Sequence, residues 1–317
     1  MTSETTAPGA VLVVGSTRHD GPGARGDRRL GARAQRRLLA WLFVAPLLLV
    51  NLLVITGPGL ASVFYSFTDW DGLNPPEFVG LANYAEMLVS SPVLGALGHN
   101  LLWTLFFLVV PMSMGLIGAF LLSRLRRGQA FFRVLYFIPY VLATVVSAAV
   151  WRQILDPESG ISSVVPLLGD VNFFGNPSLA LGSVAFVNNW QWWGFLLVIF
   201  LAAMRTVEPS LYEAARLDGA GPVREFWHIT LPSIRPTFIF LGLMTVIWSF
   251  LVFDYIYVLT QGGPAGSTDV LSTVLYREAF QNQRHGYASA VAMLLAAISA
   301  AAVLGYLALR RRLRWDI

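Results

Sequence analysis

The chain has 317 residues, of which 56% are hydrophobic and only 13% are charged, whereas a typical soluble domain is about 25% charged. The mean hydropathy is +0.61. This composition excludes a soluble two-domain protein and indicates a polytopic membrane protein. The sequence contains no Cys, which excludes disulfides, thiolate catalysis and Cys-based metal sites. All 22 basic residues are Arg, so a P-loop, which needs a Lys, and lysine Schiff-base chemistry are also excluded.

The first segment, residues 1–37, is polar and rich in Gly and Arg. It has too few apolar residues to bury a core, so the sequence predicts a disordered tail. The apolar run that follows is too long for a signal peptide and has no small-residue cleavage pattern. We therefore divide the chain into a disordered, Arg-rich tail (1–37) and a transmembrane domain (38–317).

Six apolar runs follow the tail, and each is close to the ~20 residues that a helix needs to cross a bilayer. The predicted spans cover residues 39–66, 98–122, 131–154, 181–204, 237–260 and 286–309. Pro58 predicts a kink or an end of the first span near Gly57 and Gly59. The predicted fold class is an all-α integral membrane protein with six transmembrane helices.

The arginines alternate between the two sides of these spans. Of the 22 arginines, 19 lie in the tail, in the link between spans two and three (with Arg133 just inside span three), in the link between spans four and five, and at the C-terminus. The other three are Arg152, Arg277 and Arg284. Because short cytoplasmic loops are enriched in Arg, we expect a multi-pass protein of the cytoplasmic (inner) membrane with both termini in the cytoplasm. The pI near 9.6 then reflects topology, and no nucleic-acid partner is expected.

The link between spans four and five contains helix-forming residues and helix stop and start signals that an ordinary loop lacks. Its first part, Leu211-Tyr212-Glu213-Ala214-Ala215-Arg216-Leu217, is made of helix-forming residues. Asp218-Gly219 predicts the end of this helix, since Gly readily takes a left-handed conformation, and Gly221-Pro222 predicts a new helix start. The sequence thus predicts two short helices joined by a glycine bend. One interpretation is an amphipathic linker that contacts membrane lipid.

The same link resembles a known motif. Glu213-Ala214-Ala215, Asp218-Gly219-Ala220, Ile229 and Leu231-Pro232 are spaced as in the EAA loop of binding-protein-dependent ABC importer permeases. A second stretch, residues 253–264 (FDYIYVLTQGGP), is similar to the carbohydrate-uptake subfamily, and to its MalF-like member more than to its MalG-like one. The resemblance covers roughly residues 38–310.

This resemblance implies a division of labour. It implies a transport subunit, not an enzyme, without a cofactor of its own, that moves a sugar or related polyol. Its partners would be a second EAA-bearing permease, two ATPase subunits that dock on the EAA loops, and an extracytoplasmic sugar-binding protein. The ATPase-coupling residues carried over are Glu213, Ala214, Ala215, Asp218 and Gly219. For Glu213 the alternative is an ion pair with Arg216 on the same helix, worth only ~0.2–0.5 kcal/mol.

Polar and aromatic residues share one helix face in two of the predicted spans. In span four, Asn188, Gln191, Trp192 and Phe195 are spaced i, i+3, i+4 and i+7. In span five, Trp248 and Tyr255 share a face with Leu251 and Val252. Amides bond sugar hydroxyls and flat rings cover the apolar face of a pyranose. We therefore predict a substrate path along Asn188, Gln191, Trp192, Phe195, Trp248 and Tyr255.

The resemblance places both faces along the family's sugar path, with apolar Leu251 and Val252 where amides would be expected. An alternative for the tryptophans of span four is an interfacial aromatic belt, formed by Trp190, Trp192 and Trp193.

Asp254 is the only acid inside a predicted span, and at mid-bilayer it would cost about 2.5–3.5 kcal/mol. The resemblance implies a structural or gating role for Asp254. The rival hypothesis is a proton-coupled secondary transporter that uses Asp254. A third is a membrane assembly factor without transport activity. The four histidines are scattered, so neither a metal site nor a catalytic site is expected.

Overall fold

The computed structural model describes residues 24–125, 127–165 and 171–312. The chain separates into two units, residues 1–59 and 60–317, which are described here one at a time. Residues 1–23 of the predicted tail lie outside the described part.

The described part of the first unit, residues 24–59, is helical. Helix α1 (Ala24–Asn51) begins inside the segment for which the sequence predicts disorder, because Ala, Leu and Arg are good helix formers. A π-helical turn, η1 (Leu52–Thr56), leads into α2 (Gly57–Tyr65). The Gly57 amide bonds the Leu52 carbonyl, so the wider turn lets the helix continue past Pro58 instead of ending there. Within the apolar stretch Arg37–Tyr65, an 18-residue window has a mean hydropathy of 2.7.

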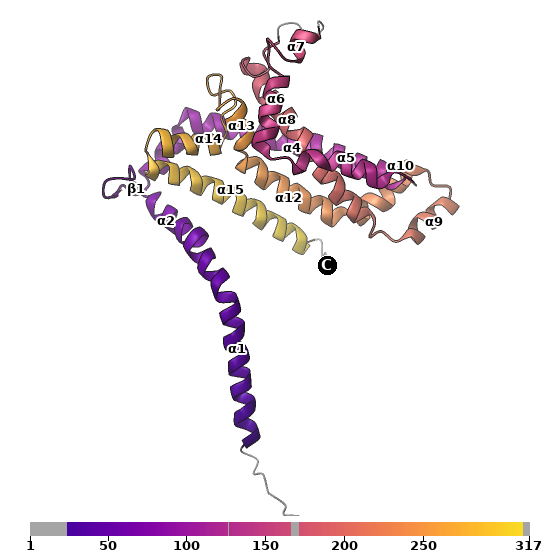
Figure 1. Cartoon of the computed structure of the whole chain (residues 1–317), viewed down its shortest axis with the longest axis horizontal. Coiled ribbons are helices and arrows are strands. Elements are labelled where there is room, and N and C mark those ends of the chain that lie inside the picture. Colours follow the sequence, from indigo (N-terminus) through magenta and orange to yellow (C-terminus); the bar gives the residue numbers. More distant parts are fainter. Residues whose placement is uncertain (1–23, 126, 166–170, 313–317) are drawn as a thin grey trace, which may run out of the picture. The chain divides into compact units, whose positions relative to one another are not determined.

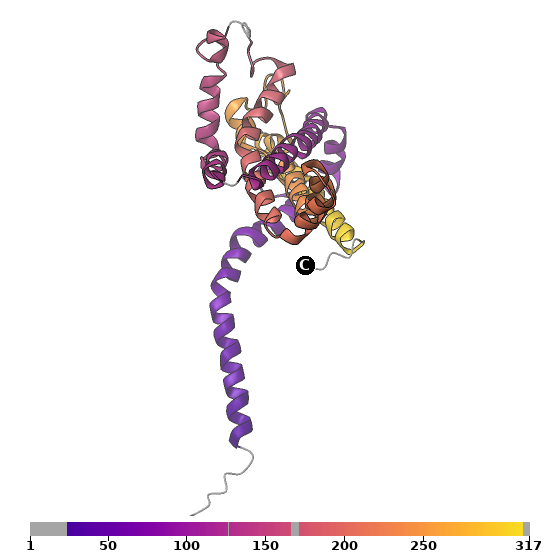
Figure 2. The same cartoon turned by 90° about the vertical axis from the view of Figure 1, so that its right-hand side faces the viewer.

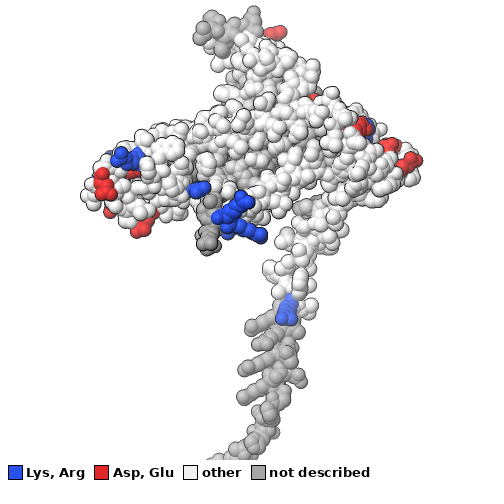
Figure 3. Space-filling model, turned by 180° about the vertical axis from the view of Figure 1, so that it is seen from behind, with Lys and Arg blue, Asp and Glu red and all other residues white. Residues whose placement is uncertain are grey.

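The second unit is built on long helices that lie side by side (Figure 1). These are α4 (Ser91–Ser123), α8 (Pro177–Met204), α12 (Arg235–Leu251) and α15 (His285–Arg312). Within the described residues of both units, five helical stretches are long and apolar enough to cross a membrane, or up to six if one bent pair counts as a span. Figure 3 shows a broad stretch of one face without charged side chains, as contact with lipid requires.

The third predicted span, 131–154, is not one helix. It is the bent pair, α5 (Gln129–Val141) and α6 (Thr144–Ile154), which meet at 94°. Figure 2 looks nearly along α5 and shows α6 rising from its end. Leu142 (φ −68°, ψ 141°) and Ala143 (φ −59°, ψ 129°) have extended dihedrals, which cannot continue a helix.

The fifth predicted span is also interrupted. Helix α12 ends at Leu251, Val252 and Phe253 are not helical, and α13 (Asp254–Leu259) follows. Asp254 therefore begins a short helix at a break inside the candidate span Arg235–Leu259.

The remaining elements are short. Between α2 and α4 lie a two-residue antiparallel hairpin, β1 (Thr68–Asp69) with β2 (Glu77–Phe78), and helix α3 (Ala82–Val89). This hairpin departs from the predicted all-α fold. Beyond the long helices lie α7 (Ile161–Val164), α14 (Leu271–Tyr276) and η4 (Arg277–Gln281). The link between α8 and α12 contains α9 (Pro209–Leu217), α10 (Pro222–Glu225), η3 (Phe226–Thr230) and α11 (Leu231–Ser233).

Helix α8 is central to the second unit because glycines let two neighbouring helices approach it closely. A Cβ built on Gly115 of α4 would lie 2.7 Å from the Cβ of Leu196. A Cβ built on Gly194 of α8 would lie 1.9 Å from the Tyr136 carbonyl oxygen of α5. Such contacts leave no room for a methyl group. The fully buried Leu196, Leu197 and Phe200 fill the core beside these positions.

We predict that Gly194→Ala pushes α5 away from α8 and lowers the free energy of unfolding by about 1–3 kcal/mol, the usual cost of overpacking. The measurement is thermal unfolding of the purified protein in detergent. Gly182→Ala is the matched control on the same helix, since nothing lies within 4 Å of its added Cβ. It should be neutral or stabilise by roughly 0.5–1 kcal/mol. Equal melting behaviour of the two variants would contradict the close α5–α8 packing.

Candidate functional site

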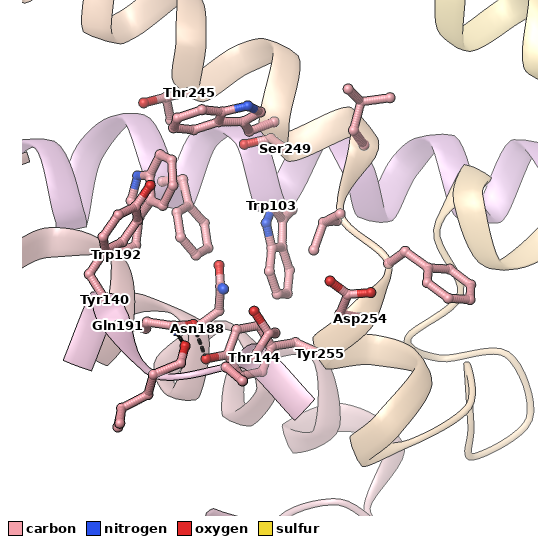
Figure 4. A pocket seen from close by; sticks show the side chains of 17 residues that line it. Trp103, Tyr140, Thr144, Asn188, Gln191, Trp192, Thr245, Ser249, Asp254 and Tyr255 are labelled. Atoms are coloured by element: carbon pink, nitrogen blue, oxygen red, sulfur yellow. Dashed lines mark hydrogen bonds between the residues drawn. The ribbon is translucent and has the colours of Figure 1, made fainter. Parts of the chain in front are cut away.

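A cavity of about 570 Å³ lies between the two helix breaks. Leu142, Ala143 and Thr144 line it from the α5–α6 break, and residues 251–255 line it from the α12–α13 break. We call it the helix-break cavity (Figure 4). The other lining residues come from α4, α5, α8 and α12, and they are Trp103, Phe107, Tyr140, Asn188, Gln191, Trp192, Thr245, Trp248 and Ser249.

The structure brings together five of the six residues predicted for the substrate path. Asn188, Gln191 and Trp192 on α8 line the cavity together with Trp248 and Tyr255. The two predicted faces meet where the Trp192 and Trp248 rings pack edge to face, with their centroids 4.2 Å apart. Phe195 does not line the cavity.

The aromatic residues of α8 contact aromatic rings of neighbouring helices. Phe195 stacks on Tyr140, with centroids 4.7 Å apart. Trp190 packs against Trp151 of α6 at 5.6 Å, and Trp193 packs against Tyr136 of α5 at 4.9 Å. Of these contacts, the one between Phe195 and Tyr140 supports the cavity directly, because Tyr140 lines it.

Gln191 and Tyr255 are occupied by hydrogen bonds within the protein. The Gln191 Nε2 donates to the Leu142 carbonyl oxygen at 2.7 Å. Its Oε1 accepts from the Tyr255 hydroxyl, which also lies 3.2 Å from Ser147 Oγ. Gln191 and Tyr255 are 7% and 2% exposed. These side chains hold α8, α13 and the α5–α6 break together, so their role is to shape the cavity.

Other polar atoms of the cavity have no protein partner. The Trp192 Nε1, Thr245 Oγ1 and Ser249 Oγ atoms are buried and without a hydrogen-bond partner among the described residues. The Asn188 side chain also makes no hydrogen bond to the described part of the chain, and Figure 4 shows it pointing into the cavity. Sequence reasoning missed Thr245 and Ser249. Their spacing from Trp248, at i, i+3 and i+4, was the signal that could have found them.

Asp254 is the only charged residue in this lining. Its side chain is exposed, and Figure 4 shows its carboxylate directed toward the middle of the cavity. It forms no ion pair with another described residue.

Residues 209–230, which we call the bend segment, fold as the spacing predicts. Helix α9 ends at Leu217, and Gly219 has φ +77°. The Ala220 amide bonds the Ala215 carbonyl oxygen at 2.9 Å, and the Gly219 amide bonds that of Arg216 at 3.1 Å. This pair of hydrogen bonds is the Schellman motif that ends a helix at a left-handed Gly. The predicted glycine bend is therefore confirmed.

Glu225 fixes the bend segment to the rest of the unit. This side chain is only 2% exposed, and its carboxylate accepts hydrogen bonds from Arg124, which follows α4, and, at 2.9 Å, from Arg216 of α9. Burial alone would raise the pKa of Glu225, but the hydrogen bonds and charges of the two arginines outweigh it, and the pKa is lowered. Arg216 thus pairs with Glu225 and not with Glu213, which rules out the predicted local ion pair.

The residues predicted to couple to the ATPase lie on the outer surface of the bend segment. Glu213, Ala214, Asp218 and Gly219 are exposed, and Ala215 is half-buried. Leu217 and Trp227 are 90% and 59% exposed, so the bend segment exposes large apolar side chains as well as charged ones.

Comparison with known proteins decides the family. Residues 111–315 match the family described as "Binding-protein-dependent transport system inner membrane component". The chain belongs to this family. The matched region contains α5, α8, α9, α12 and α13, and so most of the helix-break cavity and the whole bend segment.

Named relatives agree. The permease is 35% identical over 275 residues to the probable ABC transporter permease protein YurN of Bacillus subtilis, covering 84% of this chain and 94% of the relative. It is 31% identical to the multiple sugar-binding transport system permease protein MsmF of Streptococcus mutans (80% and 89% covered). It is 34% identical to the diacetylchitobiose uptake system permease protein NgcF of Streptomyces coelicolor (90% and 86% covered).

A solved structure shares the fold. The crystal structure of a bacterial ABC transporter involved in the import of the acidic polysaccharide alginate contains a chain that matches with a TM-score of 0.80 and 24% identity. The match covers 90% of this chain and 99% of that chain. The permease is therefore an inner-membrane transport subunit with an ABC permease fold. Membership in this family argues against the two other hypotheses from the sequence, a proton-coupled transporter and an assembly factor.

We predict that Glu225→Gln loosens the bend segment by about 1–3 kcal/mol. A fully buried pair would lose 3–5 kcal/mol, but Arg216 is 61% exposed and solvent screens part of the interaction. The measurement is hydrogen exchange of residues 209–230 at neutral pH. Leu211→Ala on the exposed side of α9 is the control and should leave exchange near the parental rate.

The pH dependence of this contact follows from the lowered pKa of Glu225. The unfolded pKa is about 4.3, so the stabilisation is fully present above that value and is lost as the pH falls through the lower, folded pKa. In Glu225→Gln this acid-induced loss should be absent.

Proposed function

We propose that this permease is one half of the pore of an ATP-driven importer of a sugar or related polyol. Its partners would be a second permease with its own EAA loop, two ATPase subunits and an extracytoplasmic sugar-binding protein. The observation that carries the proposal is the helix-break cavity, where aromatic rings surround buried polar atoms that lack protein partners.

The chemistry of the cavity suits a polyhydroxylated ligand. Amide, hydroxyl and indole groups donate and accept hydrogen bonds to sugar hydroxyls, and the Trp192 and Trp248 rings offer flat apolar faces. A buried polar group without a partner costs about 1–3 kcal/mol, which a bound hydroxyl or water would recover. Two named relatives, MsmF and NgcF, are described as permeases of sugar-binding and diacetylchitobiose uptake systems, which supports a saccharide.

The bend segment supports the coupling role proposed for Glu213, Ala214, Ala215, Asp218 and Gly219. Four of these residues are exposed and Ala215 is half-buried, and apolar Leu217 and Trp227 of the same segment are exposed too, as a protein-docking surface needs. We place this segment and both termini in the cytoplasm, because 19 of the 22 arginines lie on that side of the predicted spans. Residues 1–37 would form a separate cytoplasmic segment ahead of the permease domain.

The substrate path is tested with Asn188→Ala. Because this amide has no protein partner, its loss should leave subunit assembly intact while the half-saturating sugar concentration for uptake rises about three- to tenfold, the value of one neutral hydrogen bond. Uptake is measured in vesicles containing the complete transporter. Ser183→Ala, on the same helix but outside the cavity, should transport at the parental rate. Unchanged uptake by Asn188→Ala at low sugar would place the path elsewhere.

Coupling is tested with a pair of glycine variants two residues apart. Gly219 needs a positive φ, so Gly219→Val should introduce about 1–3 kcal/mol of backbone strain and reorient α9 against the ATPase. Gly221 has φ −79° and ψ 169°, which Val adopts readily, and both positions have open space around an added Cβ. We expect Gly219→Val to lose uptake and receptor-stimulated ATP hydrolysis, and Gly221→Val to keep both. Parental activity in Gly219→Val would rule out the coupling role.

A further inference from the structure

A second cavity, of about 590 Å³, lies beneath the bend segment. It is bounded by the end of α4, the start of α5, the end of α8 and the first turn of α9. Three of its lining residues are Arg124, Arg205 and Arg216, and we call it the arginine cavity. Gln129, Tyr212 and Thr230 add polar groups to its wall, and Phe120, Leu125, Met204 and Val207 add apolar ones.

The arginine cavity carries more positive charge than its protein partners neutralise. Glu225 is the one carboxylate that ion-pairs with these arginines in the described part of the chain, and it is shared between Arg124 and Arg216. Arg205 donates at 2.5 Å to the neutral side chain of Gln129. The C-termini of α4 and α8 contribute roughly half a negative charge each. Three guanidiniums against one carboxylate and two helix ends leave an excess of about one positive charge.

The arginines also keep donors available. Arg216 uses its Nε for Glu225, so its two terminal amino groups make no hydrogen bond to a described residue, and the side chain is 61% exposed. The ion pairs with Glu225 fix the side chains of Arg216 and Arg124. Guanidinium forks fixed in this way match the geometry of phosphate oxygens, which they bind through paired, charge-assisted hydrogen bonds.

We propose that the arginine cavity binds a phosphate group, carried by an anionic lipid or by a small soluble phosphate. Arg205, at the C-terminal end of α8, and Arg216 on α9 hold its oxygens, and the apolar wall formed by Phe120, Leu125 and Met204 covers the carbon part of a larger ligand. The bound phosphate links the end of α8 to the bend segment and stabilises the segment against the long helices. This site is separate from the helix-break cavity, and its occupancy does not depend on which substrate the permease moves.

The test uses the complete transporter with its partner subunits, in nanodiscs of phosphatidylcholine alone or of phosphatidylcholine mixed with phosphatidylglycerol. Native mass spectrometry measures retained phosphatidylglycerol, and calorimetry in the phosphatidylcholine discs measures binding of inorganic phosphate. We expect one of these probes to bind the parental protein, and Arg205→Gln to weaken that binding about tenfold or more. Retention of phosphatidylglycerol identifies the lipid as the source, and binding of inorganic phosphate identifies a soluble ligand.

Two further variants keep the test decisive. Arg224→Gln, an exposed arginine of α10 that does not line the cavity, is the matched control and should bind as the parent does. Arg205→Lys keeps the positive charge at the end of α8, and with it assembly, but loses the planar fork, so binding should fall by about threefold or more. Binding of neither probe, or equal binding by the parent and both Arg205 variants, would overturn the proposal.

Discussion

A helix that breaks inside a bilayer frees backbone groups that lipid cannot hydrogen-bond, so each must find a donor or acceptor within the protein. The second unit depends on how its two breaks meet this requirement. Gln191 of α8 donates to the Leu142 carbonyl oxygen, Ser272 of α14 to that of Val252, and Asn100 of α4 to that of Ser249. Each donor belongs to a helix other than the broken one. The bonds that make the breaks tolerable therefore also fix five helices around the helix-break cavity.

The close packing of α8 makes these bonds possible. Because Gly194 lets α8 approach the Tyr136 carbonyl of α5, the Gln191 side chain, one turn earlier, reaches the break that follows α5. The same helix then presents the half-buried Asn188 and the Trp192 indole, whose buried Nε1 has no partner among the described residues. Each such buried atom costs about 1–3 kcal/mol. The close packing around α8 thus holds polar groups in place although their unmade hydrogen bonds cost free energy in the empty cavity. A hydroxylated ligand or water in the cavity would make these hydrogen bonds and recover that cost.

Sequence periodicity predicted most of this arrangement. It did not show which polar residues hold helices together and which point into the cavity without a partner among the described residues. Apolar run lengths located the long helices, and helix spacing put Asn188, Gln191 and Trp192 on one face. Periodicity cannot distinguish Gln191, which bonds a carbonyl 49 residues away, from Asn188, which bonds nothing described. The 94° turn was missed because the apolar run continues through Leu142-Ala143, although Pro139 lies just before it. Gly219 was predictable because a left-handed helix end has a local signature, whereas the Arg124–Glu225 contact joins residues 101 positions apart.

The two cavities are connected by continuous helices. Helix α4 contributes Trp103 to the helix-break cavity and ends beside Arg124, and α8 contributes Asn188 and ends beside Arg205. From Trp103 to Arg124 the rise of an α-helix is roughly 32 Å, and no break interrupts α4 over that distance. Because the buried Glu225 joins Arg124 to Arg216, moving the bend segment without α4 would leave a buried carboxylate with fewer partners, which is costly. The bend segment and α4 are therefore expected to move together, so a displacement at one cavity reaches the other through the helix itself.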